Sequence, residues 1–322
     1  MKQGEPGTHR ARRITRDRIN SALESLERKT NDDSIHAARK ELKKARATLR
    51  LLRDALGKAA YKKENAALRD AARPLSEVRD GRVLLDALSS LLKYYGAPAA
   101  ALPLGRFRRV LDRSHRESRN NVLGKPGPLR DARQRLRDVR SRSGRWHVGR
   151  HGWSVLGAGL KRTYSRGRDA FRRARVQPDD ERLHEWRKQT KYLWHQLQVL
   201  EPLWPGQLGE LADESHELAD LLGDDHDLAV LRDRALEARE LFPDAASHNA
   251  LLALIARSRA RLQDKALQLG QRLYEERPGA FTARLGRYWR DWNQDRDSRA
   301  VAARDRAARL GSRASVPGQP AQ

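Results

Sequence analysis

A segment of twenty residues occurs twice in this chain, and this repeat restricts the possible folds more than any other feature. The segment DSIHAARKELKKARATLRLL at 33–52 aligns without a gap with ERLHEWRKQTKYLWHQLQVL at 181–200. The same offset of 148 residues continues upstream, where Arg18 matches Arg166. Self-similarity of this kind is typical of duplicated architectures. We therefore predict two halves of roughly 145 residues each, with the same order of elements.

Apolar residues recur at three- and four-residue spacing along nearly the whole chain, and the β-branched alternation of strands is absent. Breaker residues separate the periodic segments at Gly57, Pro74, 96–98, 123–128, Pro178, 201–206, Pro243 and 277–279. The segments between them are roughly 15–30 residues long, as in helical bundles. The pattern predicts an all-α fold with a disordered tail over 296–322, where the composition turns Ala/Arg-rich and then Ser/Pro/Gly/Gln-rich.

Composition excludes several classes of protein. The 322 residues include no cysteine, which excludes disulfide scaffolds, cysteine-ligated zinc, iron–sulfur clusters and thiol nucleophiles. The longest apolar run, 250–256, has seven residues, far short of the ~18 of a membrane span. The first residues lack the apolar core of a secretory signal. We expect a soluble, cytoplasmic chain with no membrane partner.

The net charge points to a polyanion. The chain carries 67 Lys and Arg against 42 Asp and Glu, a formal net charge of +25, which suits nucleic acid, an anionic membrane surface or a phosphate polymer. The charge is unevenly placed, because residues 131–175 carry a net +11 and residues 201–246 a net −10. The acidic segment is either a partner surface or a screen on the flank of a basic groove.

A basic stripe follows one face of the first repeated helix. On a helical wheel at 100° per residue, one face holds His36, Arg39, Lys40, Lys43, Arg46 and Arg50. The opposite face holds Ile35, Leu42 and Leu49. In the second copy, the polar face holds His184, Arg187, Lys188, Lys191 and His195.

Two such stripes turned toward each other would form a strongly positive groove. Like charges at helical spacing repel one another, and a linear polyanion would neutralise them together, with strongly salt-dependent affinity. Arg offers forked donors to phosphate oxygens and Lys offers a compact charge. A single basic helix face is usually the solvated side of an amphipathic helix. Recurrence of the stripe 148 residues later favours the binding interpretation.

The two repeated segments resemble the signature helices of the CHAD family (conserved histidine α-helical domain). Three further segments resemble the same family: ENAALRDAARPLSEVRDGRVLLDAL at 64–88, GLKRTYSRGRDAFRRA at 159–174 and LADLLGDDHDLAVL at 218–231. The resemblance runs from about residue 9 to about residue 292. It implies two four-helix bundles related by a pseudo-two-fold axis, with a basic channel between them that binds inorganic polyphosphate.

The resemblance also implies the residues that line the channel. From the first half these are His36, Arg39, Lys40, Lys43, Lys44 and Arg46, and Arg50 lies on the same wheel face. From the second half they are His184, Arg187, Lys188 and Lys191, joined by Arg162, Tyr164, Arg166 and Arg168. This chain departs from the family pattern at Ala47, Tyr192, Trp194 and Gln198.

The resemblance further implies a stand-alone binding module. Some family members localise to polyphosphate granules, and others are fused to a CYTH-type triphosphatase domain, whose E-x-E-x-K signature is missing from this sequence. We expect a first helical half at 9–145, a second at 146–295 and the tail beyond. Storage, granule targeting and recruitment of a polyphosphate-metabolising enzyme all stay open as roles.

The strongest hint of an enzyme is GDDHDL at 223–228, whose carboxylates and imidazole suit hard metals. Neighbouring helical residues point in different directions, so four adjacent ligands cannot converge on one ion. The repeat instead matches Asp227 with Asp80 and suggests a structural carboxylate. A phosphoryl-transfer role for His36 is disfavoured, because a nucleophile needs an orienting partner. No Walker-type loop or G-x-S-x-G elbow occurs.

Non-specific nucleic-acid binding is the alternative function, because electrostatics does not separate polyphosphate from a phosphodiester backbone. Binders of single strands interleave exposed aromatic side chains for base stacking. The stripes contain almost none, and Tyr164 is the one candidate. The sequence therefore predicts a non-enzymatic protein without cofactor, metal or catalytic residues, which binds inorganic polyphosphate.

Overall fold

A computed structural model of the chain describes residues 7–28, 31–146 and 152–313. The described residues form α-helices joined by turns and two short 3-10 helices, with no strand among them, so the predicted all-α class is confirmed. Within these ranges, no helix combines the length and the apolarity that crossing a membrane would need.

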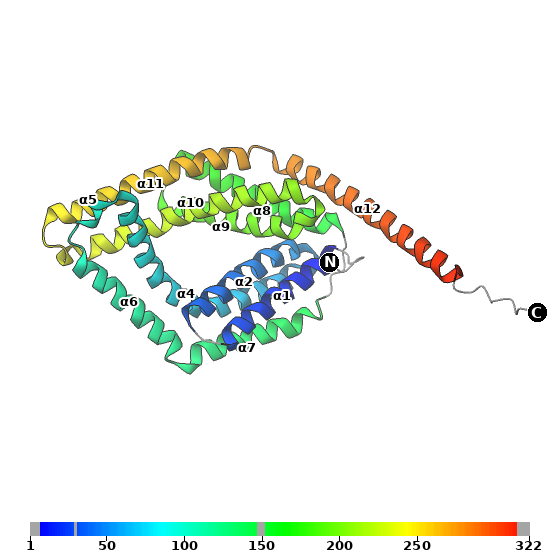
Figure 1. The fold of residues 1–322 in the computed structure, drawn as a ribbon, viewed down its shortest axis with the longest axis horizontal. Helices are drawn as coiled ribbons and strands as arrows, with labels where there is room; N and C mark the ends of the chain where they lie inside the picture. The colour runs from blue at the N-terminus through cyan, green and yellow to red at the C-terminus, as the bar shows by residue number, and fades with distance from the viewer. Residues whose placement is uncertain (1–6, 29–30, 147–151, 314–322) are drawn as a thin grey trace, which may run out of the picture.

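The first half forms a helical bundle. Its helices are α1 (Gly7–Arg28), α2 (Asp32–Leu51), α3 (Arg53–Leu56), α4 (Lys58–Tyr95), α5 (Ala97–Ala100), α6 (Gly105–Leu123) and α7 (Pro126–Ser143). Helices α1, α2, α4 and α7 pack on one another as a four-helix bundle, and α6 packs on the C-terminal part of α4 (Figure 1).

The second half repeats this order of elements. It contains α8 (Trp153–Val176), α9 (Asp180–Leu200), η1 (Glu201–Leu203), α10 (Pro205–Glu237), η2 (Arg239–Leu241), α11 (Ala245–Leu273) and α12 (Pro278–Arg313). Helix α9 packs against both α8 and α10, α11 packs along α10, and α12 packs along α8 (Figure 1). The repeated helices α2 and α9 begin 148 residues apart, at Asp32 and Asp180. The duplication itself stays a prediction.

The helix ends follow the breaker residues with one exception. Gly57 and Gly96 adopt φ of +79° and +70°, a backbone region that favours glycine, and each separates two helices. Pro74 lies inside α4 and does not end it. An interior proline costs about 3 kcal/mol. The burial of Leu68 and Leu75, on either side of it, offsets that cost.

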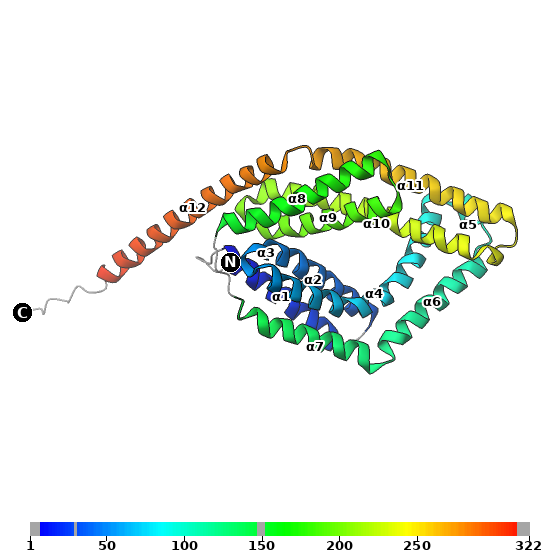
Figure 2. The same cartoon turned by 180° about the vertical axis from the view of Figure 1, so that it is seen from behind.

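One hydrophobic core spans both halves. It joins buried residues of α1, α2, α4 and α7 to those of α8, α9 and α10. A second, smaller core joins α4 and α6 to α10 and α11 at the far end of the molecule (Figure 2). The halves meet where α2 contacts α9. There the Gln196 Nε2 donates to the carbonyl oxygen of Ala47 at 3.1 Å. The two repeated helices are therefore held face to face.

Helix α12 leaves the body of the molecule and runs outward to Arg313 (Figure 1). The structure thus has helix over 296–313, where the sequence predicts a disordered tail, and residues 314–322 lie outside the described ranges. The expected boundary between the halves, near residue 145, falls between α7 and α8 and next to residues 147–151, which are also outside them.

A mixed-charge pocket as candidate functional site

Helix α2 is placed by its N-terminus and by its apolar face. Asn31 and Ser34 form a capping box, in which Ser34 N donates to Asn31 Oδ1 at 2.9 Å. Ile35, Leu42 and Leu49 are fully buried in the main core. Their burial turns the opposite, basic face toward α9, so that His36, Arg39, Lys40 and Lys43 line a pocket of about 500 Å³.

Helix α9 brings the second copy of the motif to the same pocket. Its N-cap, Asp179, accepts from Arg182 N at 2.9 Å. Arg187 and Lys191 line the pocket together with Trp194 and His195. The structure thus gathers six of the expected binding residues, from positions 148 residues apart in the sequence: His36, Arg39, Lys40, Lys43, Arg187 and Lys191.

Burial depresses the basicity of the α9 groups. Burial and the neighbouring charges of Arg187 and Arg39 lower the pKa of Lys191 to about 8, against a smaller opposite effect of Asp220 and Asp227. Burial, together with Lys44, Lys191 and Lys43, lowers the pKa of His195 to about 3. At neutral pH the floor of the pocket therefore carries a neutral imidazole beside a lysine that is easily deprotonated.

Three residues of the α2 stripe lie outside this pocket. Lys44 pairs with Glu41 at 2.9 Å. Arg46 Nε donates to Asn65 Oδ1 at 3.2 Å, and burial above all lowers its pKa. The Arg50 guanidinium lies over the Tyr192 ring, 3.7 Å from its centroid. Arg50 thus bridges α2 and α9 at one of the positions where this chain departs from the family pattern.

Two residues of the α9 stripe also lie beside the pocket, outside its lining. The His184 ring is 4.7 Å from that of His226, which does line the pocket. Burial, then the charge of His226, lowers the pKa of His184. Lys188 forms an ion pair with Glu185, one turn away.

The four expected residues on α8 are placed away from the pocket. Arg162 pairs with Asp54 at 2.6 Å, and Arg166 is exposed. Arg168 Nε donates to the carbonyl oxygen of Tyr274 at 2.9 Å. Tyr164 is fully buried and stacked on Phe281, with a centroid distance of 4.0 Å. These side chains tie α8 to its neighbours.

The burial of Tyr164 also decides its chemistry. Its hydroxyl lies 3.1 Å from the carbonyl oxygens of Leu273 and Glu276, and burial raises its pKa. The ring that could stack on a nucleobase is therefore enclosed in the core.

Sequence reasoning missed the wall that α10 contributes. The α10 residues in the pocket lining are His216, Asp220, Gly223, Asp224, His226, Asp227 and Val230. The three carboxylates at positions i, i+4 and i+7 share one helix face, a spacing visible in the sequence. The segment expected to be a partner surface or a screen therefore forms one side of the pocket.

Gly223 lets α9 and α10 approach closely at the pocket. A Cβ atom at this position would lie 3.3 Å from both Nε and Nη2 of Arg187. The Arg187 guanidinium thus packs against the α10 backbone, and its Nε is buried without a hydrogen-bond partner among the described residues. Gly223 is buried at this contact, and the next residue, Asp224, is exposed.

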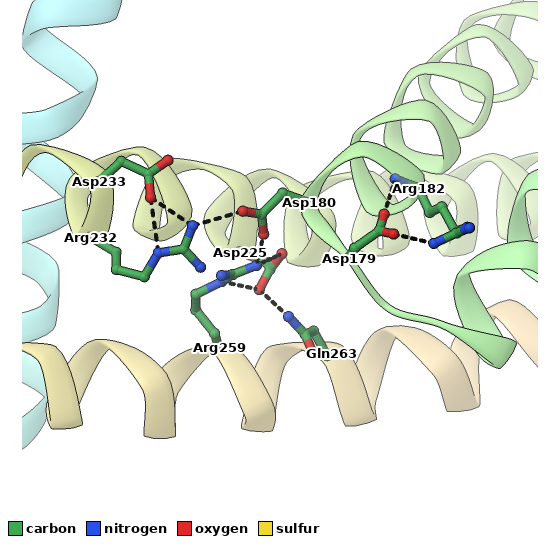
Figure 3. Close-up of polar contacts among 8 residues, drawn as sticks. All are labelled: Asp179, Asp180, Arg182, Asp225, Arg232, Asp233, Arg259 and Gln263. Atoms are coloured by element: carbon green, nitrogen blue, oxygen red, sulfur yellow. Dashed lines mark hydrogen bonds and ion pairs between the residues drawn. The ribbon is translucent and has the colours of Figure 1, made fainter. Parts of the chain in front are cut away.

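The structural carboxylate of GDDHDL is Asp225, where the sequence pointed to Asp227. Asp225 is buried and accepts from Arg259 Nε at 2.9 Å and from Gln263 Nε2 at 2.8 Å (Figure 3). Its neighbours Asp224 and Asp227 face the pocket. Asp225 thus points away from the pocket that Asp224, His226 and Asp227 line, as expected for successive residues of a helix.

The same arginine fixes the start of α9. Arg259 Nη2 lies 2.5 Å from Asp180 Oδ1, and Arg232 Nη2 lies 2.8 Å from Asp180 Oδ2 (Figure 3). Burial opposes the ionisation of Asp180, but the hydrogen bonds from Arg232 and Arg259 outweigh it and lower the pKa. The network joins α9, α10 and α11 and orients the helix that carries Arg187 and Lys191.

Across the described ranges, no group of three or more His, Asp or Glu side chains is placed to hold a metal ion. In the pocket, the ring of His216 is oriented by a carboxylate, because His216 Nδ1 lies 2.9 Å from Asp220 Oδ2. The His216 ring also packs edge-on against Trp194, at a centroid distance of 3.8 Å.

Comparisons with known proteins address the family and the fold. The chain is similar in structure to PptA from Streptomyces chartreusis, with a TM-score of 0.59 and 15% sequence identity, over 84% of this chain and 100% of that one. At that identity the likeness shows the fold alone. None of the curated proteins searched matched the chain. The model of the CHAD domain matches residues 13–236, and the chain therefore belongs to the CHAD family.

Proposed function

We propose that this chain binds inorganic polyphosphate in the pocket between α2 and α9. The observation that carries the proposal is the convergence of Arg39, Lys43, Arg187 and Lys191 on one cavity of about 500 Å³. These side chains come from both halves and repel one another while the pocket is empty of anions. A chain of phosphates would relieve this repulsion at every step along its length and release its own counterions.

The aromatic side chains favour polyphosphate over nucleic acid. Trp194, in the pocket lining, is 9% exposed and lies between the rings of His195 and His216. Tyr164 is enclosed in the core. Single-strand binders gain roughly 1–3 kcal/mol per base from exposed aromatic platforms. The pocket offers cations without such a platform, which suits a ligand made of phosphates alone.

Competition binding at a fixed salt concentration tests the proposal. Labelled single-stranded nucleic acid is bound to the full chain and titrated with long-chain polyphosphate at equal phosphate concentration. We expect polyphosphate to displace the nucleic acid. Failure to displace it would leave non-specific nucleic-acid binding as the better description.

We propose further that binding occurs without catalysis. The pair His216–Asp220 in the pocket resembles an oriented base, but a half-exposed ring with a half-exposed carboxylate is also a common surface pair. Incubation with polyphosphate should release no phosphate above the level of a His216→Ala variant. Release that is lost in that variant would establish a hydrolase.

Binding of this kind would recruit the chain to polyphosphate granules, which is the cellular role we propose. A fluorescent fusion should colocalise with granules, and an Arg39→Glu/Lys43→Glu fusion should be diffuse. A variant that still reaches the granules would assign targeting to another surface or to a partner such as a polyphosphate-metabolising enzyme.

A further inference from the structure

The pocket is lined by basic residues on one side and by acidic residues on another. Arg39 and Lys43 on α2 and Arg187 and Lys191 on α9 form the basic side. We call the row Asp220, Asp224 and Asp227 on α10 the acidic wall. A site built for a polyanion has no need of carboxylates in its lining, since like charges brought together at a binding interface weaken association.

Asp224 is the member of the acidic wall with the least compensation. The side chain is exposed at its edge, but its partial desolvation in the pocket, then the charges of Asp227 and Asp220, raise its pKa, and Arg187 and Lys191 only partly oppose this. The next residue shows the contrast, because Asp225 accepts hydrogen bonds from Arg259 and Gln263. Asp224 also lines an adjoining pocket of about 330 Å³ between α4, α10 and α11 and a shallow one of about 410 Å³ on α10, so it stands at the junction of three cavities.

The acidic wall and the basic side act on each other. Asp220 and Asp227 favour the charged form of Lys191, while Arg187 and Arg39 disfavour it. Without ligand, the carboxylates therefore partly neutralise the cations that would bind phosphate. With ligand, the same carboxylates face additional negative charge across the pocket.

We propose that the acidic wall, through Asp224 above all, limits how tightly the pocket binds polyphosphate at neutral pH and makes that binding tighten as the pH falls. This inference rests on the proposed function. Protonation of Asp224 removes one of the charges that repel the ligand, and bound phosphate favours the protonated form further. Binding is thus coupled to uptake of a proton, and lower pH strengthens it.

Other groups around Asp224 also titrate or contribute to the electrostatic potential at its carboxylate. The described charged and titratable groups are His36, Arg39, Lys40 and Lys43 on α2; Arg187, Lys191 and His195 on α9; Asp213, His216, Glu217, Asp220, His226 and Asp227 on α10; Asp86 and Tyr94 on α4; and Arg261 on α11. Any imidazole that takes up a proton adds a positive charge and also strengthens the binding of an anion. His195, with its pKa of about 3, stays neutral. The pH dependence of affinity in the natural chain is therefore the sum of several groups, and a variant is needed to isolate the contribution of Asp224.

Asp224→Asn isolates that part. The amide is neutral at every pH, and the side chain is exposed, so the substitution spares the core. We expect polyphosphate affinity at pH 7 to rise about three- to tenfold. The gain over the natural chain should shrink as the pH falls, because the natural carboxylate, whose pKa is raised, takes up a proton that the amide cannot.

The matched control is Glu210→Gln. Glu210 is an exposed carboxylate on the same helix, outside all three cavities, and its loss changes the net charge by the same amount. Dissociation constants for polyphosphate are measured at pH 5, 6 and 7 and constant salt for the natural chain and both variants, with circular dichroism at each pH. Equal affinities for the two variants at every pH would overturn the inference. Absence of binding by the natural chain would instead overturn the proposed function.

Discussion

Helices α2 and α9 carry the same motif at the same spacing but contribute different chemistry. In α2, His36, Lys40 and Lys43 are exposed at the pocket. In α9, burial lowers the pKa of Lys191 to about 8, and His195 is buried and neutral. More of the circumference of α9 is covered, since Gln189, Thr190, Trp194 and Gln196 are buried as well. The α2 copy places Lys40 and Lys43 at the exposed rim of the pocket, and the α9 copy places a lysine of lowered pKa, Lys191, at its buried floor.

The ion pairs at the first residues of α2 and α9 also differ in burial, and again the contact of α9 is the more buried one. Asp32 and Asp180 occupy the first position of α2 and α9, and each pairs with an arginine of the half's later helix, Arg119 on α6 and Arg259 on α11. The first pair is half-exposed, at 43% and 39% for the two side chains. Arg259 is 10% exposed and also pairs with Asp225, which is 2% exposed. The same contact is a surface ion pair in one half and a buried network in the other.

The largest expected effect is on stability, and it distinguishes the buried contacts of Arg259 from the exposed contact of Arg119. Arg259→Ala leaves Asp225 charged and buried, and we expect a loss of about 3–5 kcal/mol in the free energy of unfolding. Arg119→Ala removes the matching exposed contact and should cost less than about 1 kcal/mol. Urea denaturation followed by circular dichroism measures both. Equal losses would contradict the view that burial distinguishes the two halves.

Reversal of the charge at the rim should have the largest effect on binding. Arg39→Glu/Lys43→Glu should weaken polyphosphate binding about 100-fold at low salt and reduce the slope of log affinity against log salt by about two. The control Lys62→Glu/Lys63→Glu makes a similar change of net charge at exposed positions of α4 outside the pocket. A similar loss in the control would mean that only net charge matters.

Affinity should depend on alkaline pH through Lys191 at the floor of the pocket, and not through Lys43 at its rim. Because the pKa of Lys191 is about 8, its charge is lost as the pH rises through that value, and affinity should fall by up to about fivefold between pH 7 and 9. Lys191→Arg keeps the charge and should flatten this profile. Lys43→Arg, at the matching position of α2, should retain the decline of the natural chain. Binding measured at pH 7, 8 and 9 distinguishes the two, and identical profiles would refute the assignment to Lys191.

The smallest effect concerns the contact between α9 and α10. In Gly223→Ala the new Cβ meets the Arg187 guanidinium at 3.3 Å, so we expect affinity to fall about twofold to threefold as the guanidinium shifts. Gly209→Ala on the same helix meets no atom closer than 3.9 Å and should leave affinity unchanged. Both changes should stabilise the helix by up to about 1 kcal/mol. Calorimetric binding with thermal unfolding measures the two quantities, and a loss of affinity in Gly209→Ala would remove the steric explanation.

The basic stripes were predictable because helical periodicity and an internal repeat are properties of short segments. Periodicity assigns Arg39, Lys43, Arg187 and Lys191 to polar faces, and the structure places all four in one pocket. The family resemblance, in contrast, put Tyr164 and Arg168, with Arg162 and Arg166, beside them. Their backbone and core partners, such as Leu273 and Tyr274, lie more than 100 residues further along the chain. Such partners leave no trace in local spacing.

The sequence by itself determined the all-α class and the two basic helix faces, because these depend on residues within a few turns of each other. Only the tertiary structure decided what stands opposite those faces. The acidic wall of α10, the enclosure of Tyr164 and the different basicity of α2 and α9 all arise from packing between distant segments. Packing sets both burial and the distances between charges, and these in turn set pKa values and the field in the pocket.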